Sequence, residues 1–275
     1  MNYETLQFEV REHVGWLTLN RPDRLNAMSL EMVRELRHFF SSLEDNLDIR
    51  VVVLRGAGRA FCVGLDLQST PGFEEGATMD QGIGTRLRPR GFMITRNFAD
   101  MVVTMRQAPQ PIIASVRGMA VGGGFAIALA SDIRLAGDTA RFNVGAPRIG
   151  FSAGEMGISY HLPRLIGVSR AALYMYSARF IDAPTSERIG LVSEVVPDDR
   201  LDQATEELAR ELLNISPFAL RMTKEVLNAN INASSLEEAT ALENRTQLLC
   251  SFTGDAAEAV KAVFVEKRAP VYTDE

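Results

Sequence analysis

The chain has 275 residues, 46% of them hydrophobic, and a formal net charge of −6. That composition fills a sizeable core, and the acidic balance argues against nucleic acid as the main partner, although local basic patches can still bind an anionic cofactor. The 2 cysteines, Cys62 and Cys250, give no disulfide framework, and no apolar run reaches the roughly 18 residues of a membrane span. The start, MNYETLQFEV, lacks the features of a signal peptide, so we expect a cytoplasmic protein that acts away from membranes.

The N-terminal part predicts a hairpin, a helix and a buried strand. Apolar residues alternate over residues 6–10 and continue over 14–19, which is typical of two paired strands. Ser29 is placed to cap an amphipathic helix from about Leu30 to Leu43. Val51 to Leu54 form an apolar, β-branched run that indicates a buried strand. Small residues and glycines follow it in RGAGRAFCVGLDL, up to a polar turn at Asp66.

The segment from Ser69 to Gly91 is rich in glycine, proline and charge. We predict a long loop there, and such loops are usually functional or mobile. Its arginines Arg86, Arg88 and Arg90 would suit an acidic substrate, but a solvated charge run explains them as well. A helix from about Phe92 to Gln107 leads out of this loop.

The central stretch, residues 111–135, reads PIIASVRGMAVGGGFAIALASDIRL. Ile112 to Val116 predict a buried strand, and Phe125 to Ala130 predict a helix that carries no charge and must be buried. The triple glycine 122–124 between them suits backbone that approaches another group closely or adopts positive φ. Unpaired N–H groups at such a helix start can hold a developing negative charge. A dinucleotide fingerprint would need glycine at Ile127, whereas a turn required only for packing stays possible.

Several motifs occur in a fixed order around this stretch. AFCVGLDL at 60–67 and ASVRGMAVGGGFAIALASDIRLA at 114–136 predict repeated strand–turn–helix units whose turns face one cleft. The other motifs are LNRPDRLNAMS near the start, LPRLIG, GLVSEVVP and, near the end, FVEKRAP. Together they resemble the crotonase family, also called the enoyl-CoA hydratase/isomerase family, over essentially the whole chain.

The resemblance implies an α/β crotonase fold, which is a spiral of repeated ββα units. We expect the core with the acyl-CoA site in residues 1–200 and a C-terminal helical region for oligomerisation in residues 201–275. Four amphipathic patterns, at 201–213, 218–229, 236–251 and 255–267, agree with such a region. Members of the family use it to build trimers, often paired as hexamers, so a homotrimer or hexamer is expected.

The same resemblance implies an acyl-CoA or enoyl-CoA thioester as substrate and no permanently bound cofactor. The thioester oxygen would lie in an oxyanion hole made by the backbone N–H groups of Leu65 and Gly123. Coenzyme A would contact Arg24, Leu25, Ala60, Leu65, Asp66, Leu67, Gly122, Gly123, Phe264 and Lys267. A solvated loop arginine is the alternative for Arg24, and an ordinary terminal helix is the alternative for Phe264 and Lys267.

The catalytic carboxylates are where the chain departs from the family. Members that hydrate carry two glutamates, and the matching positions here are Ala126 and Ala146, neither of which can move a proton. Glu155 falls where similarity to dienoyl-CoA isomerase implies an aspartate base, and where similarity to chlorobenzoyl-CoA dehalogenase implies an aspartate nucleophile. It is the acid/base candidate, with a pKa raised by apolar neighbours such as Met156. Alternatively, Glu155 is an exposed residue that caps a helix beginning near Met156.

Three classes of function remain open at this point. Enoyl-CoA hydratase/isomerase chemistry comes first, a non-catalytic acyl-CoA binder is the second, and a hydrolase or dehalogenase that uses Glu155 as nucleophile is the third. His13 and His38 have the pattern of exposed or edge residues, and His161 that of a packed helix residue. No set of histidine, cysteine and carboxylate residues has metal-site spacing, so no metal is expected.

Overall fold

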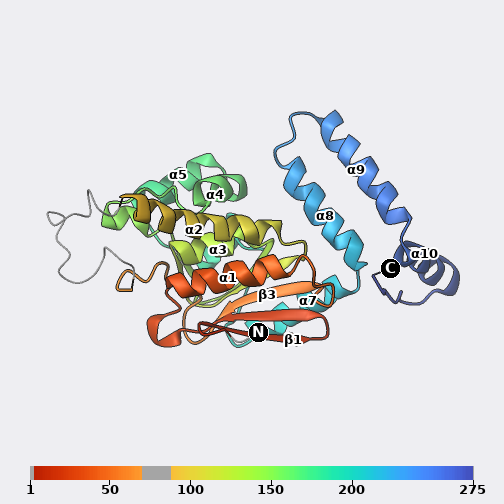
Figure 1. Cartoon of the computed structure of the whole chain (residues 1–275), viewed down its shortest axis with the longest axis horizontal. Coiled ribbons are helices and arrows are strands. Elements are labelled where there is room, and N and C mark those ends of the chain that lie inside the picture. Colours follow the sequence, from red (N-terminus) through yellow and green to blue (C-terminus); the bar gives the residue numbers. More distant parts are fainter. Residues whose placement is uncertain (1–2, 70–87, 275) are drawn as a thin grey trace.

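The computed structural model describes residues 3–69 and 88–274, and its centre is a six-stranded sheet (Figure 1). The strands lie in the order β1-β2-β3-β4-β6-β9. Their bounds are Leu6–Arg11, Val14–Leu19, Val51–Gly56, Ile112–Val116, Ile133–Gly137 and Glu194–Val196. β1 pairs antiparallel with β2, and every later pairing is parallel. The predicted N-terminal hairpin is therefore confirmed.

Helices cover both faces of this sheet. The helices α1 (Leu30–Ser42), α2 (Arg88–Gln107) and α3 (Gly123–Ala130) contribute to one apolar cluster with Val52 and Leu54 of β3. On the other face, α7 (Leu201–Leu213) packs in a second cluster with Val51 and Val53. Since alternate side chains of a strand point to opposite faces, burial on both faces explains the uninterrupted apolar run of β3.

A small second sheet connects the central strand to the helix that follows it. It contains β5 (Met119–Val121), β7 (Arg141–Asn143) and β8 (Ile181–Asp182), in that order. The elements around it are the 3-10 helices η1 (Pro22–Arg24) and η3 (Ala146–Ile149) and the helices α4 (Ile158–Ile166), α5 (Val168–Ser177) and α6 (Ala183–Arg188). Because β5 runs directly into α3, this sheet positions the glycine turn between them.

The last helices form an arm that stands away from the sheet (Figure 1). The arm contains α8 (Pro217–Asn230), α9 (Leu236–Ser251), α10 (Gly254–Val260) and a π-helical segment, Lys261–Glu266. The preceding helix α7 lies on the sheet with the core, and the expected division after residue 200 stays a prediction. None of the helices in the described ranges is long and apolar enough to cross a membrane.

The predicted helix bounds agree closely with the structure, with three differences. α2 starts at Arg88 rather than Phe92, because Pro89 occupies its first turn, where proline is tolerated. The final helix stops at Val260 and continues as the π-helical segment. α4 begins at Ile158, two residues later than expected. Arg86 and most of the predicted loop, residues 70–87, lie outside the described residues.

Candidate active site

Two glycine-containing turns meet at the start of α3: the first turn contains Gly64, and the second is the triple glycine 122–124. The backbone of Cys62 joins the first turn to β5, since the Val121 N–H donates to its carbonyl at 2.9 Å. A Cβ atom on Gly124 would lie 2.0 Å from that same carbonyl oxygen, and a Cβ atom on Gly64 would lie 3.5 Å from the Gly123 nitrogen. The two turns therefore face each other, and contact this close excludes any side chain at Gly124.

The backbone N–H groups at this junction are available to a ligand. Gly122 is the N-cap of α3 with φ 52° and ψ −119°, a conformation that favours glycine. The N–H groups of Leu65 and Gly123 donate to no acceptor within residues 3–69 and 88–274. The first N–H groups of a helix carry partial positive charge, so this junction suits an oxygen atom that becomes negative.

A set of hydrogen bonds fixes the first turn against the loop that precedes α1. Arg21 forms an ion pair with Asp66 at 2.9 Å, and the Asp66 N–H donates to the Met28 carbonyl at 2.9 Å. The buried Asn26 amide donates to the Ala60 carbonyl at 2.8 Å. Burial acts to raise the pKa of Asp66, but hydrogen bonds from Arg21 and Ser69 outweigh it and hold that pKa below its usual value. Asp66 therefore stays ionised and keeps the turn in place.

The residues expected to contact coenzyme A fall into two groups. Arg24 is exposed beside the first turn, where its Nη1 donates to Gln68 Oε1 at 2.7 Å. Leu25, which follows Arg24, and Leu67, which precedes Gln68, are half-buried. Phe264 and Lys267 instead lie in and just after the π-helical segment that follows α10. Figure 1 shows α10 at the far end of the molecule from α4 and α5. A single chain thus leaves these two residues away from the turns.

Glu155 lies at the glycine turn. Its Oε1 is 3.4 Å from the position that a Cβ atom on Gly122 would occupy, and the residue is half-buried. Burial raises the pKa of its carboxyl to about 7. Within the described part of the chain, this carboxyl has no hydrogen bond and no ion pair. The carboxyl is therefore poised between its two protonation states near neutral pH, as acid/base groups are.

The alternative interpretation of Glu155 as a helix cap is wrong. Gly157 is the N-cap of α4, and no side chain caps that helix. Met156 and Gly157 both adopt positive φ, at 45° and 82°, so the chain turns sharply directly after Glu155. Such a conformation is uncommon for methionine and is often found at functional sites.

Two methionine sulfur atoms, which the sequence did not indicate, complete the junction. A Cβ atom on Gly123 would lie 3.1 Å from the Sδ of Met156 and 3.3 Å from that of Met28. Thioether side chains are flexible and apolar, so they can exclude water here and still make room for a ligand. Met28 lies between Ala27 and Ser29, and Met156 lies between Glu155 and Gly157; neither setting predicts that the two sulfur atoms meet.

The comparisons with known proteins bear on this geometry. The profile of the enoyl-CoA hydratase/isomerase family matches residues 9–275. The chain belongs to that family. The crotonase resemblance seen in the motifs and the expected crotonase fold are thereby confirmed.

Relatives and solved structures agree over nearly the full length. The probable enoyl-CoA hydratase EchA12 of Mycobacterium tuberculosis is 37% identical over 96% of this chain and 91% of its own. A structure of an enoyl-CoA hydratase from Bacillus anthracis has a TM-score of 0.89 at 30% identity, covering 99% of this chain and 100% of the other. A probable enoyl-CoA hydratase/isomerase from Mycobacterium abscessus has a TM-score of 0.86 at 31% identity, covering 99% and 100%.

The two positions that the resemblance assigns to the glutamates of hydrating members are apolar and enclosed. Ala126 lies in the first turn of α3 and is fully buried, and Ala146, which opens η3, is 8% exposed. The histidines agree with their sequence patterns, because His13 and His38 are exposed and His161 is half-buried on α4. In the described ranges, no group of three or more histidine, cysteine or carboxylate side chains could hold a metal ion.

Proposed function

We propose that this family member is an enzyme that transfers a proton at the acyl group of an enoyl-CoA thioester. The reaction is a double-bond isomerisation or a hydration, and no permanently bound cofactor takes part. The observation that carries the proposal is Glu155, a half-buried carboxyl with a pKa of about 7 beside Gly122. A general base works best when its pKa lies near the operating pH.

In this proposal the thioester oxygen binds between the N–H groups of Leu65 and Gly123. The unpaired state of both groups and the close approach of the two turns support that assignment. As the α-proton leaves, negative charge builds up on the oxygen, and donors fixed in advance stabilise it. Removing one such donor in other enzymes raises the barrier by roughly 3–4 kcal/mol.

A single carboxylate favours isomerisation over hydration. Glu155 would take a proton from one carbon of the acyl group, and the resulting enolate would be held by the two N–H groups. The same carboxyl, now protonated, would return the proton to a different carbon, so that the double bond moves. Hydration also needs a second group for the attacking water, and Ala126 and Ala146 supply none.

The other two functions remain as alternatives with distinct signatures. A non-catalytic binder would bind acyl-CoA without exchanging its α-protons. A hydrolase would use Glu155 as a nucleophile, forming an anhydride with the acyl group and expelling coenzyme A as free thiol. The raised pKa of Glu155 favours proton transfer, because a nucleophile needs its ionised form.

The deciding experiment compares the parent protein with Glu155→Gln. Both are given 2-enoyl-, 3-enoyl- and dienoyl-CoA thioesters in deuterated water, and product, α-carbon deuterium and free thiol are measured. The substitution keeps the size of the side chain but removes the proton-accepting carboxylate. We expect a rate loss on the order of 10²–10⁴ with acyl-CoA affinity retained.

Each remaining outcome assigns a different function. Equal activity in the parent and the variant would mean that a group other than Glu155 carries out the proton transfer. If the parent binds acyl-CoA but shows neither turnover nor deuterium exchange, the protein is a non-catalytic binder. Thiol release that Glu155→Gln abolishes would point to the hydrolase.

We also propose that the helical arm assembles the chain into trimers or hexamers. Its exposed apolar residues support this, including Leu248, Leu249, Phe252, Phe264 and Val265. Several large apolar side chains exposed on neighbouring elements usually mark a contact surface between proteins. Assembly would let Phe264 and Lys267 contact coenzyme A on a neighbouring subunit, which would account for their distance from the turns of their own chain. We expect them to serve the site only in the oligomer.

A further inference from the structure

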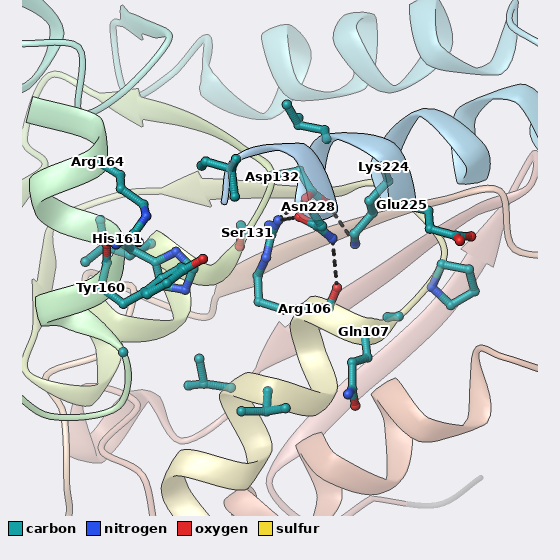
Figure 2. Close-up of a pocket in the computed structure, with 18 of the residues that line it drawn as sticks. Arg106, Gln107, Ser131, Asp132, Tyr160, His161, Arg164, Lys224, Glu225 and Asn228 are labelled. Atoms are coloured by element: carbon teal, nitrogen blue, oxygen red, sulfur yellow. Dashed lines mark hydrogen bonds and ion pairs between the residues drawn. The ribbon is translucent and has the colours of Figure 1, made fainter. Parts of the chain in front are cut away.

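A groove of about 950 Å³ is lined by residues of α2, α4 and α8 (Figure 2). Met156 lines it, and the sulfur of the same side chain faces Gly123 at the glycine turn. Gly157 also lines the groove, next to the His161 ring. The movable side chain of Met156 thus stands between the turn that would hold a thioester and the groove.

The end of the groove beside α4 carries three guanidinium groups, and Asp132 is the carboxylate whose charge acts on two of them, Arg106 and Arg134. Arg106 forms an ion pair with Asp132 at 2.7 Å. Arg134 and Arg164, in contrast, form no ion pair with any carboxylate in the described residues. Figure 2 shows Arg164, Tyr160 and His161 together at this end, with Lys224 and Glu225 at the other. The end beside α4 is therefore the more strongly cationic one.

Arg134 is 6% exposed and still has donors to spare. Its Nε and Nη1 donate to backbone carbonyls of Leu191, Ser131 and Ala128 at 2.8, 2.7 and 3.4 Å. Its Nη2 donates to no acceptor among the described residues, although Arg134 lines the groove. A buried guanidinium with unused N–H groups is a strong site for a carboxylate, which can accept two parallel hydrogen bonds.

Arg164 and His161 add donors at the same end. The Arg164 guanidinium lies over the Tyr160 ring, 3.7 Å from its centre. Its Nη1 donates to the Tyr160 carbonyl at 2.8 Å, and its Nη2 donates to Asn232 Oδ1 at 3.1 Å in the loop after α8. The His161 side chain has no hydrogen bond within the described part of the chain. Burial and the surrounding arginines Arg106, Arg134 and Arg164 lower the pKa of His161 to about 4. The ring is thus neutral at pH 7 and offers one N–H donor, while its environment favours an anion.

We propose that the groove receives the far end of the acyl group, and that Arg134, Arg164 and His161 bind a carboxylate there. The substrates would then be coenzyme A monothioesters of dicarboxylic acids rather than of plain fatty acids. This inference rests on the proposed function, since it assumes that a thioester is held at Leu65 and Gly123. A methyl-ended chain in the same groove would cover the buried Arg134 without supplying an acceptor for its Nη2, which is unfavourable in a partly enclosed site.

The test compares two unsaturated thioesters of equal carbon number, one ending in a carboxylate and one in a methyl group. The proteins are the parent, Arg164→Met, His161→Leu and the control Arg170→Met, an exposed arginine on α5 outside the groove. We expect kcat/KM of the parent to favour the carboxylate-ended thioester by about tenfold or more. Arg164→Met should reduce that preference about tenfold by raising KM for the carboxylate-ended thioester, without raising KM for the methyl-ended one, and Arg170→Met should change neither value.

A calorimetric arm makes the inference independent of turnover. Saturated thioesters with the same two ends, which cannot react, are titrated into each protein. The carboxylate-ended compound should bind the parent about tenfold more tightly, and Arg164→Met should remove this advantage. A parent that turns over the methyl-ended thioester but shows no preference in kinetics or binding would overturn the inference and leave the proposed function intact. Tighter binding of the carboxylate-ended compound without any turnover would instead support the inference and contradict the proposed function.

Discussion

Replacing Glu155 by glutamine is expected to stabilise the protein at alkaline pH while it removes activity. Burial raises the pKa of this carboxyl from 4.5 to about 7 in the folded protein. A raised carboxyl pKa means that folding favours the protonated form. The resulting stability is fully present below pH 4.5 and is lost as the pH rises through about 7.

The size of this effect follows from the pKa. Each pKa unit corresponds to ~1.36 kcal/mol, so complete ionisation of Glu155 lowers the free energy of unfolding by at most about 3 kcal/mol. Glu155 is half-buried, and solvent screening reduces the expected value to about 1–3 kcal/mol. A chain of this size shifts its Tm by roughly 2–4 °C for each kcal/mol. Glu155→Gln should therefore melt several degrees above the parent at pH 8.5, and the gap should nearly close at pH 4.5.

The assay is thermal and urea unfolding of both proteins from pH 4.5 to 8.5 at one protein concentration, because assembly makes Tm depend on concentration. Glu211→Gln, at an exposed glutamate of α7, is the matched control and should follow the parent at every pH. A stability gap between Glu155→Gln and the parent that stays constant with pH would refute the reasoning. So would a variant less stable than the parent at pH 8.5, since that would mean that ionised Glu155 has a favourable partner.

Four further outcomes are expected. The rate should rise with pH around an apparent pKa near 7, because Glu155 is proposed to act as the base in its carboxylate form, and a flat pH–rate profile from pH 5 to 9 would contradict this. Gly123→Pro removes the N–H donor at a helix position where proline is tolerated, so the kcat of this variant should fall at least ~100-fold. Gly123→Ala keeps the donor and should retain more activity than Gly123→Pro. Equal rates for the two variants would exclude the oxyanion assignment. Lys224→Ala breaks a buried ion pair with Asp132 at 2.9 Å and should lower the free energy of unfolding by about 2–4 kcal/mol in urea titrations, and a loss below ~1 kcal/mol would contradict the role of that pair. Phe252→Glu places a charge on an exposed apolar position of the arm and should shift the sedimentation profile toward monomer, unless the arm takes no part in assembly.

Local patterns were enough to predict most elements of the fold. Ser29 caps α1 as expected, with its hydroxyl accepting from the Met32 N–H at 3.2 Å. The apolar run at Val51 indicated a buried strand. The run is continuous because alternate side chains of this strand are buried in two separate clusters, one on each face of the sheet. The start of α2 was predicted too late because a proline and a glycine near a helix end look like loop residues when read alone.

The site was harder to predict because long-range contacts position its side chains. The sequence identified Glu155 as a candidate, but no local pattern shows that its carboxyl lies beside Gly122, 33 positions earlier in the chain. Asn26 gave no signal of its own in the sequence, yet its amide donates to the carbonyls of Ala57 and Ala60, 31 and 34 positions away. The polarity of the groove depends on where α8 lies relative to α4, and no local pattern contains that information.

Because α8 lines the groove and also belongs to the arm, the position of the arm determines how wide the groove is. Near the middle of this helix, Lys224 contacts Asp132 at 2.9 Å, and just beyond its end Asn232 donates to the Tyr160 hydroxyl at 2.5 Å. Asp132 and Tyr160 both line the groove, so a small tilt of α8 relative to them would open or narrow it. In the proposed oligomer, a subunit that packs against the arm would set that tilt from outside. Substitutions on the outer surface of the arm are then expected to change KM for long acyl groups without touching any residue that lines the groove, and dilution of the oligomer should have the same effect.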